Sequence, residues 1–139
     1  MDYKIEKNIL AVRLYEGEYL VSGLEESFKK AGSNLGILLN AAGMMQDVKL
    51  GYFIGKGEYK ENIFISPREI VSLTGNIINN DRGFYTHLHV SLADDDGKTC
   101  GGHVQEAKVH GTGEVFIYLS DMKVTRKMEE QTGLEGLKL

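Results

Sequence analysis

The sequence predicts a single domain over residues 1–139, in which strands form a sheet and one main helix packs beside it. Three observations lead to this architecture. Residues 18–31 place apolar side chains at spacings of three and four, as an amphipathic helix does. Most other apolar segments are short and alternate with polar residues, as half-buried strands do. The 17 glycines beside one proline indicate many tight turns and bulges.

The first predicted strand covers residues 7–15. Its alternation places Leu10, Val12 and Leu14 on one face and Arg13 on the other, less apolar face. Gly17 then breaks the strand. We expect the arginine to be solvated, because an exposed ion pair would contribute little.

The predicted helix spans residues 18–31 and carries its charged side chains on the solvent side. Ser22 and Glu25 have the spacing of a capping box, although Glu18 offers an earlier start. Gly32 is the expected C-terminal stop. The apolar stripe of the helix consists of Leu20, Val21, Leu24, Phe28 and Ala31.

Four strands are predicted in the middle of the chain. The continuous apolar run Ile37-Leu38-Leu39, within residues 33–44, favours a strand that is buried on both faces. The small residues that follow it suit close packing of a helix or of another subunit. The other three segments alternate and cover residues 46–54, 59–66 and 69–78, the last with a kink at Gly75.

The next segment begins a stretch that holds three of the four histidines. Residues 84–92 alternate between apolar and polar side chains. In a strand, residues two apart share a face, so His87 and His89 point to the same side. Two imidazoles at this spacing can converge on one ion.

A turn decides where the third histidine lies. The stretch Asp95-Asp96-Gly97 fits a three-residue hairpin loop with glycine in the left-handed region. Such a loop pairs Asp94 with Lys98, and counting outward places His103 opposite His89. Directly opposed residues share a face, so all three imidazoles would cluster.

Two alternatives would separate the histidines. A two-residue loop at Asp96-Gly97 would place His103 opposite Val90, on the wrong face. A bulge at Gly101-Gly102 would also change the register. The cluster therefore depends on the turn type and on an unbroken pairing.

Three neutral imidazoles on one face suit a borderline metal such as zinc, with nitrogen ligands at roughly 2.0–2.1 Å. Three protein ligands leave a fourth position open for water or a small molecule. The alternative is an ordinary half-exposed sheet face whose histidines hydrogen-bond to their neighbours. Cys100 is expected as a small buried residue on the opposite face, unless a bulge turns it toward the histidines. His110 is expected at the surface, with a fourth-ligand role as the alternative.

The remaining residues predict a closing strand and a polar tail. Residues 108–120 are rich in apolar and β-branched side chains, and we expect them to complete the sheet. In the tail, residues 123–139, Gly133 and Gly136 interrupt any helix. Leucines at positions 134, 137 and 139 could dock the tail on the core or on a neighbouring molecule.

Composition excludes several classes of protein. The formal charge is −4, from 16 basic and 20 acidic residues, so direct DNA binding by this chain alone is disfavoured. Cys100 is the single cysteine, so an internal disulfide is excluded. With no signal peptide recognised at the N-terminus, we expect a cytoplasmic protein. No apolar run approaches the roughly 18 residues that cross a membrane, and phosphate-loop and serine-elbow motifs are absent.

Motifs along nearly the whole chain resemble the PPC domain, the plant-and-prokaryote-conserved domain that plants attach to AT-hook DNA-binding segments. The most specific part of the pattern is His-Leu-His followed by Gly-Gly-His. The matching motifs, in chain order, are Arg13-Leu14, Gly17-Glu18, Glu69, Ser72-Leu73-Thr74-Gly75, His87-Leu88-His89, Asp96-Gly97, Gly101-Gly102-His103, Gly111-Thr112, Glu114-Val115 and Thr132-Gly133-Leu134.

The resemblance implies an α+β fold, with a mixed, strongly bent, antiparallel-rich sheet and one main helix packed on it. It also implies a homotrimer. In stand-alone prokaryotic members the motif histidines are associated with a metal, usually zinc, which here names His87, His89 and His103 as metal ligands. The chain departs from the plant pattern because it has no AT-hook segment and its charge is negative.

Three functions follow as hypotheses. The first is a homotrimeric binding module with a three-histidine zinc site that accepts a small molecule. The second is a metal-dependent hydrolase or lyase, in which Glu69, Glu106 or Glu114 would be the general base beside metal-bound water. The third is a DNA-associated regulator that acts through a partner. Residue patterns alone do not decide whether the chain is an enzyme.

Overall fold

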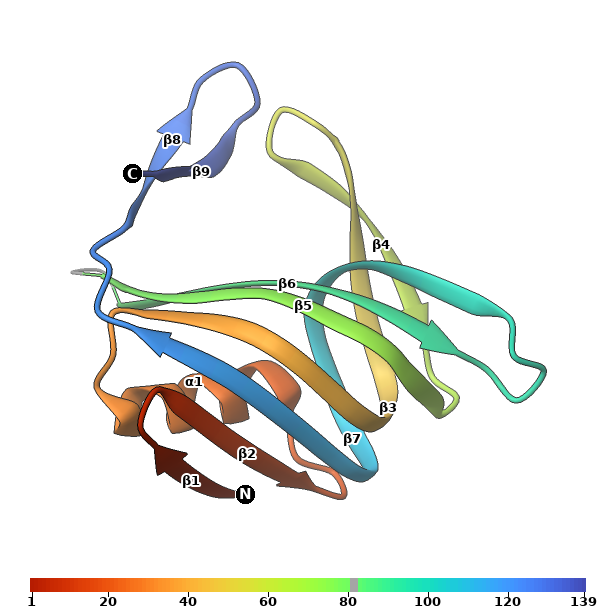
Figure 1. Cartoon of the computed structure of the whole chain (residues 1–139). Helices are drawn as coiled ribbons and strands as arrows, with labels where there is room; N and C mark the ends of the chain where they lie inside the picture. Colours follow the sequence, from red (N-terminus) through yellow and green to blue (C-terminus); the bar gives the residue numbers. More distant parts are fainter. Residues whose placement is uncertain (81–82) are drawn as a thin grey trace.

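The computed structural model describes residues 1–80 and 83–139, and Figure 1 shows their arrangement. The described residues form one helix and nine strands. In chain order these are β1 (Asp2–Glu6), β2 (Ile9–Tyr15), α1 (Leu20–Ala31), β3 (Leu35–Gly55), β4 (Glu58–Phe64), β5 (Arg68–Asn80), β6 (Gly83–Ala93), β7 (Thr99–Ser120), β8 (Thr125–Glu129) and β9 (Leu134–Lys138).

The α+β prediction is wrong, because strands make up 71% of the described residues and helix only 9%. At two places where the sequence predicts the end of one strand and the start of another, the structure has a single long strand that bends. Residues 33–44 and 46–54 both belong to β3, which is 21 residues long. The second arm of the histidine hairpin and residues 108–120 both belong to β7, which is 22 residues long. Bulges let the strands turn without ending, and β3 shifts register against β7 at four places.

Four strands of the large sheet pair in a closed ring. The large sheet has the order β1-β2-β7-β6-β5-β3-β4, and β7 pairs additionally with β3. The strands β3, β5, β6 and β7 therefore form a ring of neighbours, in which each is hydrogen-bonded to the next. All the pairings between described strands are antiparallel, whereas a mixed sheet was expected.

The core lies between this sheet and α1. The predicted faces of the first strand are confirmed, since Leu10, Val12 and Leu14 are buried and Arg13 is exposed. The helical stripe packs on the same core through residues that include Leu20, Leu24 and Phe28. Burial of such side chains is the main stabilising contribution, about 1.5–3 kcal/mol for each.

The ends of α1 differ in how well the sequence predicts them. Gly32 ends the helix in the left-handed conformation, with φ of 67°, as expected. The capping box is wrong, because the N-cap is Tyr19 and no side chain of the first turn caps it. Instead, the backbone N–H of Val21 donates to Oε1 of Glu106, a carboxylate from β7, at 3.0 Å.

One face of the sheet leaves apolar side chains uncovered. The prediction that the Ile37-Leu38-Leu39 run is buried on both faces is wrong. Leu38 is 6% exposed, whereas Ile37 is 42% and Leu39 is 54% exposed. Tyr118, directly opposite Ile37 on β7, and Phe116 are exposed as well. The helix covers only the other face, so the described residues provide no second layer here.

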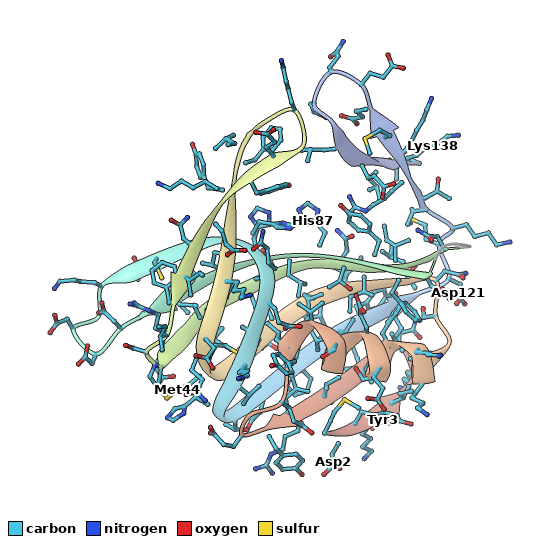
Figure 2. All side chains as sticks on the ribbon, turned by 180° about the vertical axis from the view of Figure 1, so that it is seen from behind. Asp2, Tyr3, Met44, His87, Asp121 and Lys138 are labelled. Carbon is cyan, nitrogen blue, oxygen red and sulfur yellow. The ribbon has the colours of Figure 1, made fainter. Side chains whose placement is uncertain are left out.

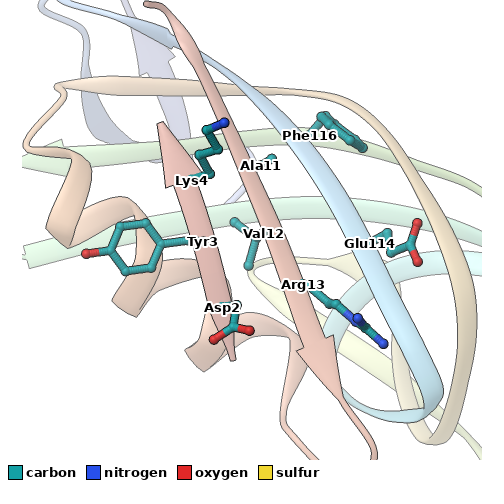
Figure 3. Close-up of a pocket in the computed structure, with 8 residues that line it drawn as sticks. All are labelled: Asp2, Tyr3, Lys4, Ala11, Val12, Arg13, Glu114 and Phe116. Carbon is teal, nitrogen blue, oxygen red and sulfur yellow. The ribbon is translucent and has the colours of Figure 1, made fainter. Parts of the chain in front are cut away.

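A pocket lies beside this exposed apolar face, on strands β1, β2 and β7 (Figure 3). It is lined by the residues Asp2, Tyr3, Lys4, Ala11, Val12, Arg13, Glu114 and Phe116. The histidines are absent from this lining.

The C-terminal tail forms the separate β8–β9 hairpin. It stands across the large sheet from α1, next to the turn between β3 and β4 (Figure 1). The two are joined by the backbone N–H of Gly57, which donates to the carbonyl oxygen of Thr132 at 2.8 Å. The turn of the tail thus contacts the β3–β4 turn, while Leu139 is 93% exposed. No helix in the described part of the chain is long and apolar enough to span a membrane.

Gly43→Ala should destabilise the fold more than Gly55→Ala. Both glycines have similar positive φ angles, 123° and 116°, so both substitutions carry backbone strain on the order of 1–3 kcal/mol. A methyl group at position 43 would also lie 1.9 Å from the carbonyl oxygen of Thr112, whereas position 55 is open. Urea unfolding of the two variants measures the difference, and equal losses would show that the β3–β7 contact does not constrain position 43.

Candidate metal centre

The turn between β6 and β7 has the predicted three-residue form. The N–H of Asp94 donates to the carbonyl of Lys98 at 3.0 Å, and the N–H of Gly97 donates to the carbonyl of Asp94 at 2.9 Å. Gly97 has φ of 75°, the left-handed conformation that this loop requires. The Asp94 carboxylate also accepts from the backbone N–H groups of Lys98, at 2.8 Å, and Asp96, at 3.2 Å.

The register that follows from this turn is unbroken. His89 lies opposite His103, and no bulge interrupts the pairing from there to the turn. Both alternatives that would have separated the histidines are therefore excluded. The two glycines serve close approach, since a methyl group at Gly101 would lie 2.6 Å from the carbonyl oxygen of Val90.

The structure brings the three predicted histidines together. One ring nitrogen from each of His87, His89 and His103 lies within 4.8 Å of the others. The Nε2 atoms of His87 and His89 are 3.2 Å apart. In Figure 2, His87 points away from the helix side of the sheet, toward the region between the β3–β4 and β8–β9 hairpins.

The spacing between His87 and His89 fits a tetrahedral zinc site. Two nitrogens at roughly 2.0–2.1 Å from zinc, separated by the tetrahedral angle, lie about 3.3 Å apart. The 3.2 Å between His87 and His89 is close to that value. Nδ1 of His103 is buried and has no hydrogen-bond partner among the described residues, which an ordinary hydrogen-bonded sheet face would not leave. The donor set therefore fits a metal better than the structural alternative.

The electrostatics also favour a metal. Burial, together with the charges of Arg126, His103 and His89, lowers the pKa of His87 to about 4. Burial, followed by the charge of His89, lowers the pKa of His103. Both imidazoles are thus neutral at pH 7, with lone pairs available for a cation.

The surroundings of the cluster include residues that the sequence did not single out. The ring of Tyr59 lies 5.2 Å from that of His103. Arg126 in β8 and Asn76 in β5 approach His87, and all of these residues line a cavity of about 310 Å³. Asn76 lies on a strand that the sequence predicts, and pairing that strand with the histidine strand would have placed Asn76 opposite His87. No sequence pattern indicated Arg126, because the tail was recognised only by its polar composition.

The other candidate ligands lie elsewhere. Cys100 is half-buried and packs against the core, as expected, with no part in the histidine cluster. His110 lies 3.5 Å from the Glu16 carboxylate, and it is absent from the cluster.

The candidate general bases are not at the histidines either. Glu106 accepts hydrogen bonds from the N–H groups of Val21 and Ala107 and so serves a structural role. Glu114 lines the pocket of Figure 3. Glu69 is exposed on β5, and none of the three lines the histidine cavity.

Comparison with known sequences adds a family match. The sequence model of the Plants and Prokaryotes Conserved (PCC) domain matches residues 1–120. Bifunctional GlmU proteins from two Synechococcus strains are 27% identical over 128 residues, which is 90% of this chain. The chain spans only 19% of the length of these curated relatives.

Several solved structures are similar over nearly all of the chain. A plant- and prokaryote-conserved (PPC) protein from Pyrococcus horikoshii is 31% identical, with a TM-score of 0.80 and coverage of 99% of this chain and 97% of that one. A metal-containing protein from Archaeoglobus fulgidus is also 31% identical, with a TM-score of 0.84 and the same coverage. A Bacteroides thetaiotaomicron protein proposed to bind DNA is 27% identical, with a TM-score of 0.91 and coverage of 99% and 96%.

Asp94→Asn should lower the melting temperature by weakening the turn that aligns the histidines. Hydrogen bonds, first from the N–H of Lys98, hold the pKa of the Asp94 carboxyl below its ordinary value of 3.8. Their contribution is therefore fully present above about pH 4 and is lost as the pH falls through the lower folded pKa. The difference in melting temperature between wild type and variant should be largest at neutral pH and shrink as the pH falls below 3.8, as circular dichroism can measure.

Asp95→Asn is the matched control for this prediction. Asp95 lies in the same turn, is exposed, and makes no side-chain hydrogen bond or ion pair with the described residues. It should melt like the wild type at every pH. A variant at position 94 whose melting temperature follows that of the control would contradict the role assigned to its carboxylate.

Proposed function

The chain belongs to the Plants and Prokaryotes Conserved domain family, and from that premise we propose that it is a homotrimeric binding module with a zinc ion on His87, His89 and His103. The observation that carries the proposal is the convergence of three imidazole nitrogens within 4.8 Å on one face of the sheet. The metal-containing Archaeoglobus relative supports it, since that protein is 31% identical over nearly the whole chain.

The role of the metal follows from the donor set. Three neutral imidazoles leave one tetrahedral position for water or a small molecule, and zinc there supplies a Lewis acid. The cavity beside the cluster gives such a molecule room. We propose ligand binding as the role of this site. The three glutamates that the sequence offered as general bases, Glu69, Glu106 and Glu114, are absent from the lining of the cavity.

The uncovered apolar face supports the homotrimer. Ile37, Leu39, Phe116 and Tyr118 lie on neighbouring strands and are all exposed in the single chain. Contiguous apolar surface of this kind is typical of subunit interfaces. The trimer would bury the side chains that α1 leaves uncovered.

A DNA-related role would require a partner. The Bacteroides relative is proposed to bind DNA, yet the charge of this chain is −4 and phosphate backbones attract positive surfaces. Such a role would use the trimer as a scaffold, with the positive charge supplied by another protein. The single cysteine suits a reducing compartment, and the cytoplasm is part of this proposal.

Protein purified without chelator or histidine tag should contain close to one zinc per chain. His87→Ala, His89→Ala and His103→Ala should each lower zinc affinity by more than about 100-fold, because changes to residues that merely support metal ligands already cost about 10–100-fold. Inductively coupled plasma mass spectrometry and competition with a chromogenic chelator measure content and affinity.

His110→Ala is the control, because this histidine lies beside Glu16 and outside the cluster. It should retain wild-type zinc affinity. Full zinc content in all three cluster variants would end the assignment of these ligands.

Leu39→Glu should convert the trimer to monomers, because it places a charge in the middle of the exposed apolar face. Ile63→Glu is the matched control, since Ile63 is similarly exposed but lies on β4, at the far side of the large sheet from β1 and β2. Size-exclusion chromatography with multi-angle light scattering measures both. A monomeric wild type, or a trimeric Leu39→Glu variant, would refute the interface.

A further inference from the structure

Arg126 is a half-buried cation beside the histidine cluster, and among the described residues no carboxylate forms an ion pair with it. One terminal nitrogen donates to the carbonyl oxygen of Glu135 at 2.9 Å, and the other donates to Oδ1 of Asn76 at 3.0 Å. The second nitrogen is also 3.4 Å from Nδ1 of His87. The guanidinium carbon lies 4.1 Å from the centre of the Tyr85 ring.

These contacts fix the guanidinium in place without neutralising its charge. Neutral oxygens and an aromatic face hold it, while its Nε is buried with no hydrogen-bond partner in the described structure. A half-buried charge without a counter-charge costs free energy, and so does a buried N–H that makes no hydrogen bond. An anionic group in the cavity would supply the missing counter-charge.

The cavity indicates what kind of anion fits. Its lining combines Arg126 with the rings of Tyr59 and Tyr85 and with Leu134 and Leu137, so it suits a ligand with an apolar body. Glu129 and Glu135 line the same cavity and would repel a doubly charged group more strongly than a singly charged one. The planar fork of an arginine matches a carboxylate.

We propose that Arg126 is the recognition residue for a small monocarboxylate with an apolar body, which binds in this cavity beside His87 and His103. Binding of the carboxylate to Arg126 does not require a metal. Only a contact between the same ligand and a metal on the histidines would depend on the proposed function. The segment that supplies Arg126, Leu134 and Leu137 lies beyond residues 1–120, the part that matches the family. The proposed ligand class therefore depends on side chains of the C-terminal hairpin.

The test titrates benzoate and, separately, inorganic phosphate into the full chain by isothermal calorimetry, in both zinc-loaded and zinc-free protein. Benzoate should bind the wild type in at least one form, more tightly than phosphate does. Arg126→Gln should weaken benzoate binding by about tenfold or more, because it removes a charge-assisted contact. Arg13→Gln is the matched control, since Arg13 also lies over a tyrosine ring but faces the pocket of Figure 3.

Asn76→Asp keeps the arginine in place and gives it an internal carboxylate, so it should also weaken benzoate binding without removing Arg126. This variant decides the case if Arg126→Gln fails to fold. Three results would each overturn the proposal. Benzoate affinity could be unchanged in both variants, benzoate could fail to bind both the zinc-loaded and the zinc-free protein, or phosphate could bind more tightly than benzoate. Zinc content is measured on the same samples, so a loss of the metal site is distinguished from a loss of anion recognition.

Discussion

The pairing register between β6 and β7 is the constraint on which the histidine site depends. Side chains in a strand alternate between faces, so a slip of one residue would carry His103 through the sheet to the side of α1. The turn around Gly97 sets that register, and it does so through backbone hydrogen bonds and the carboxylate of Asp94. A few contacts at the tip of a hairpin thus determine whether three imidazoles, six to ten residues from Gly97 along the chain, can share an ion.

The same periodicity explains what could be predicted from the sequence. The buried face of β2, the stripe of α1 and the grouping of His87, His89 and His103 all follow from local spacing, and the structure confirms these arrangements. The fold class could not be read in this way. Bulges inside β3 and β7 look like strand ends in the sequence, so two long strands were counted as several short ones and the helix was given too much weight.

Arg126 shows a second limit of sequence reasoning. Its approach to Asn76 and His87 depends on how a polar tail folds back over the sheet, and no local pattern encodes that contact. The histidines lie within the residues that match the family model, whereas the arginine lies after them.

The β8–β9 hairpin is a separate two-stranded sheet, and this affects how a ligand can enter the cavity. The hairpin pairs with itself and is held near the sheet by side-chain contacts and the Gly57–Thr132 hydrogen bond, rather than by a ladder to a neighbouring strand. Local opening of such a unit costs less free energy than opening of the large sheet. Amide hydrogens of β8 and β9 should then exchange with solvent faster than those of β6 and β7. Access to the cavity can be gated by the tail while the imidazoles stay in place.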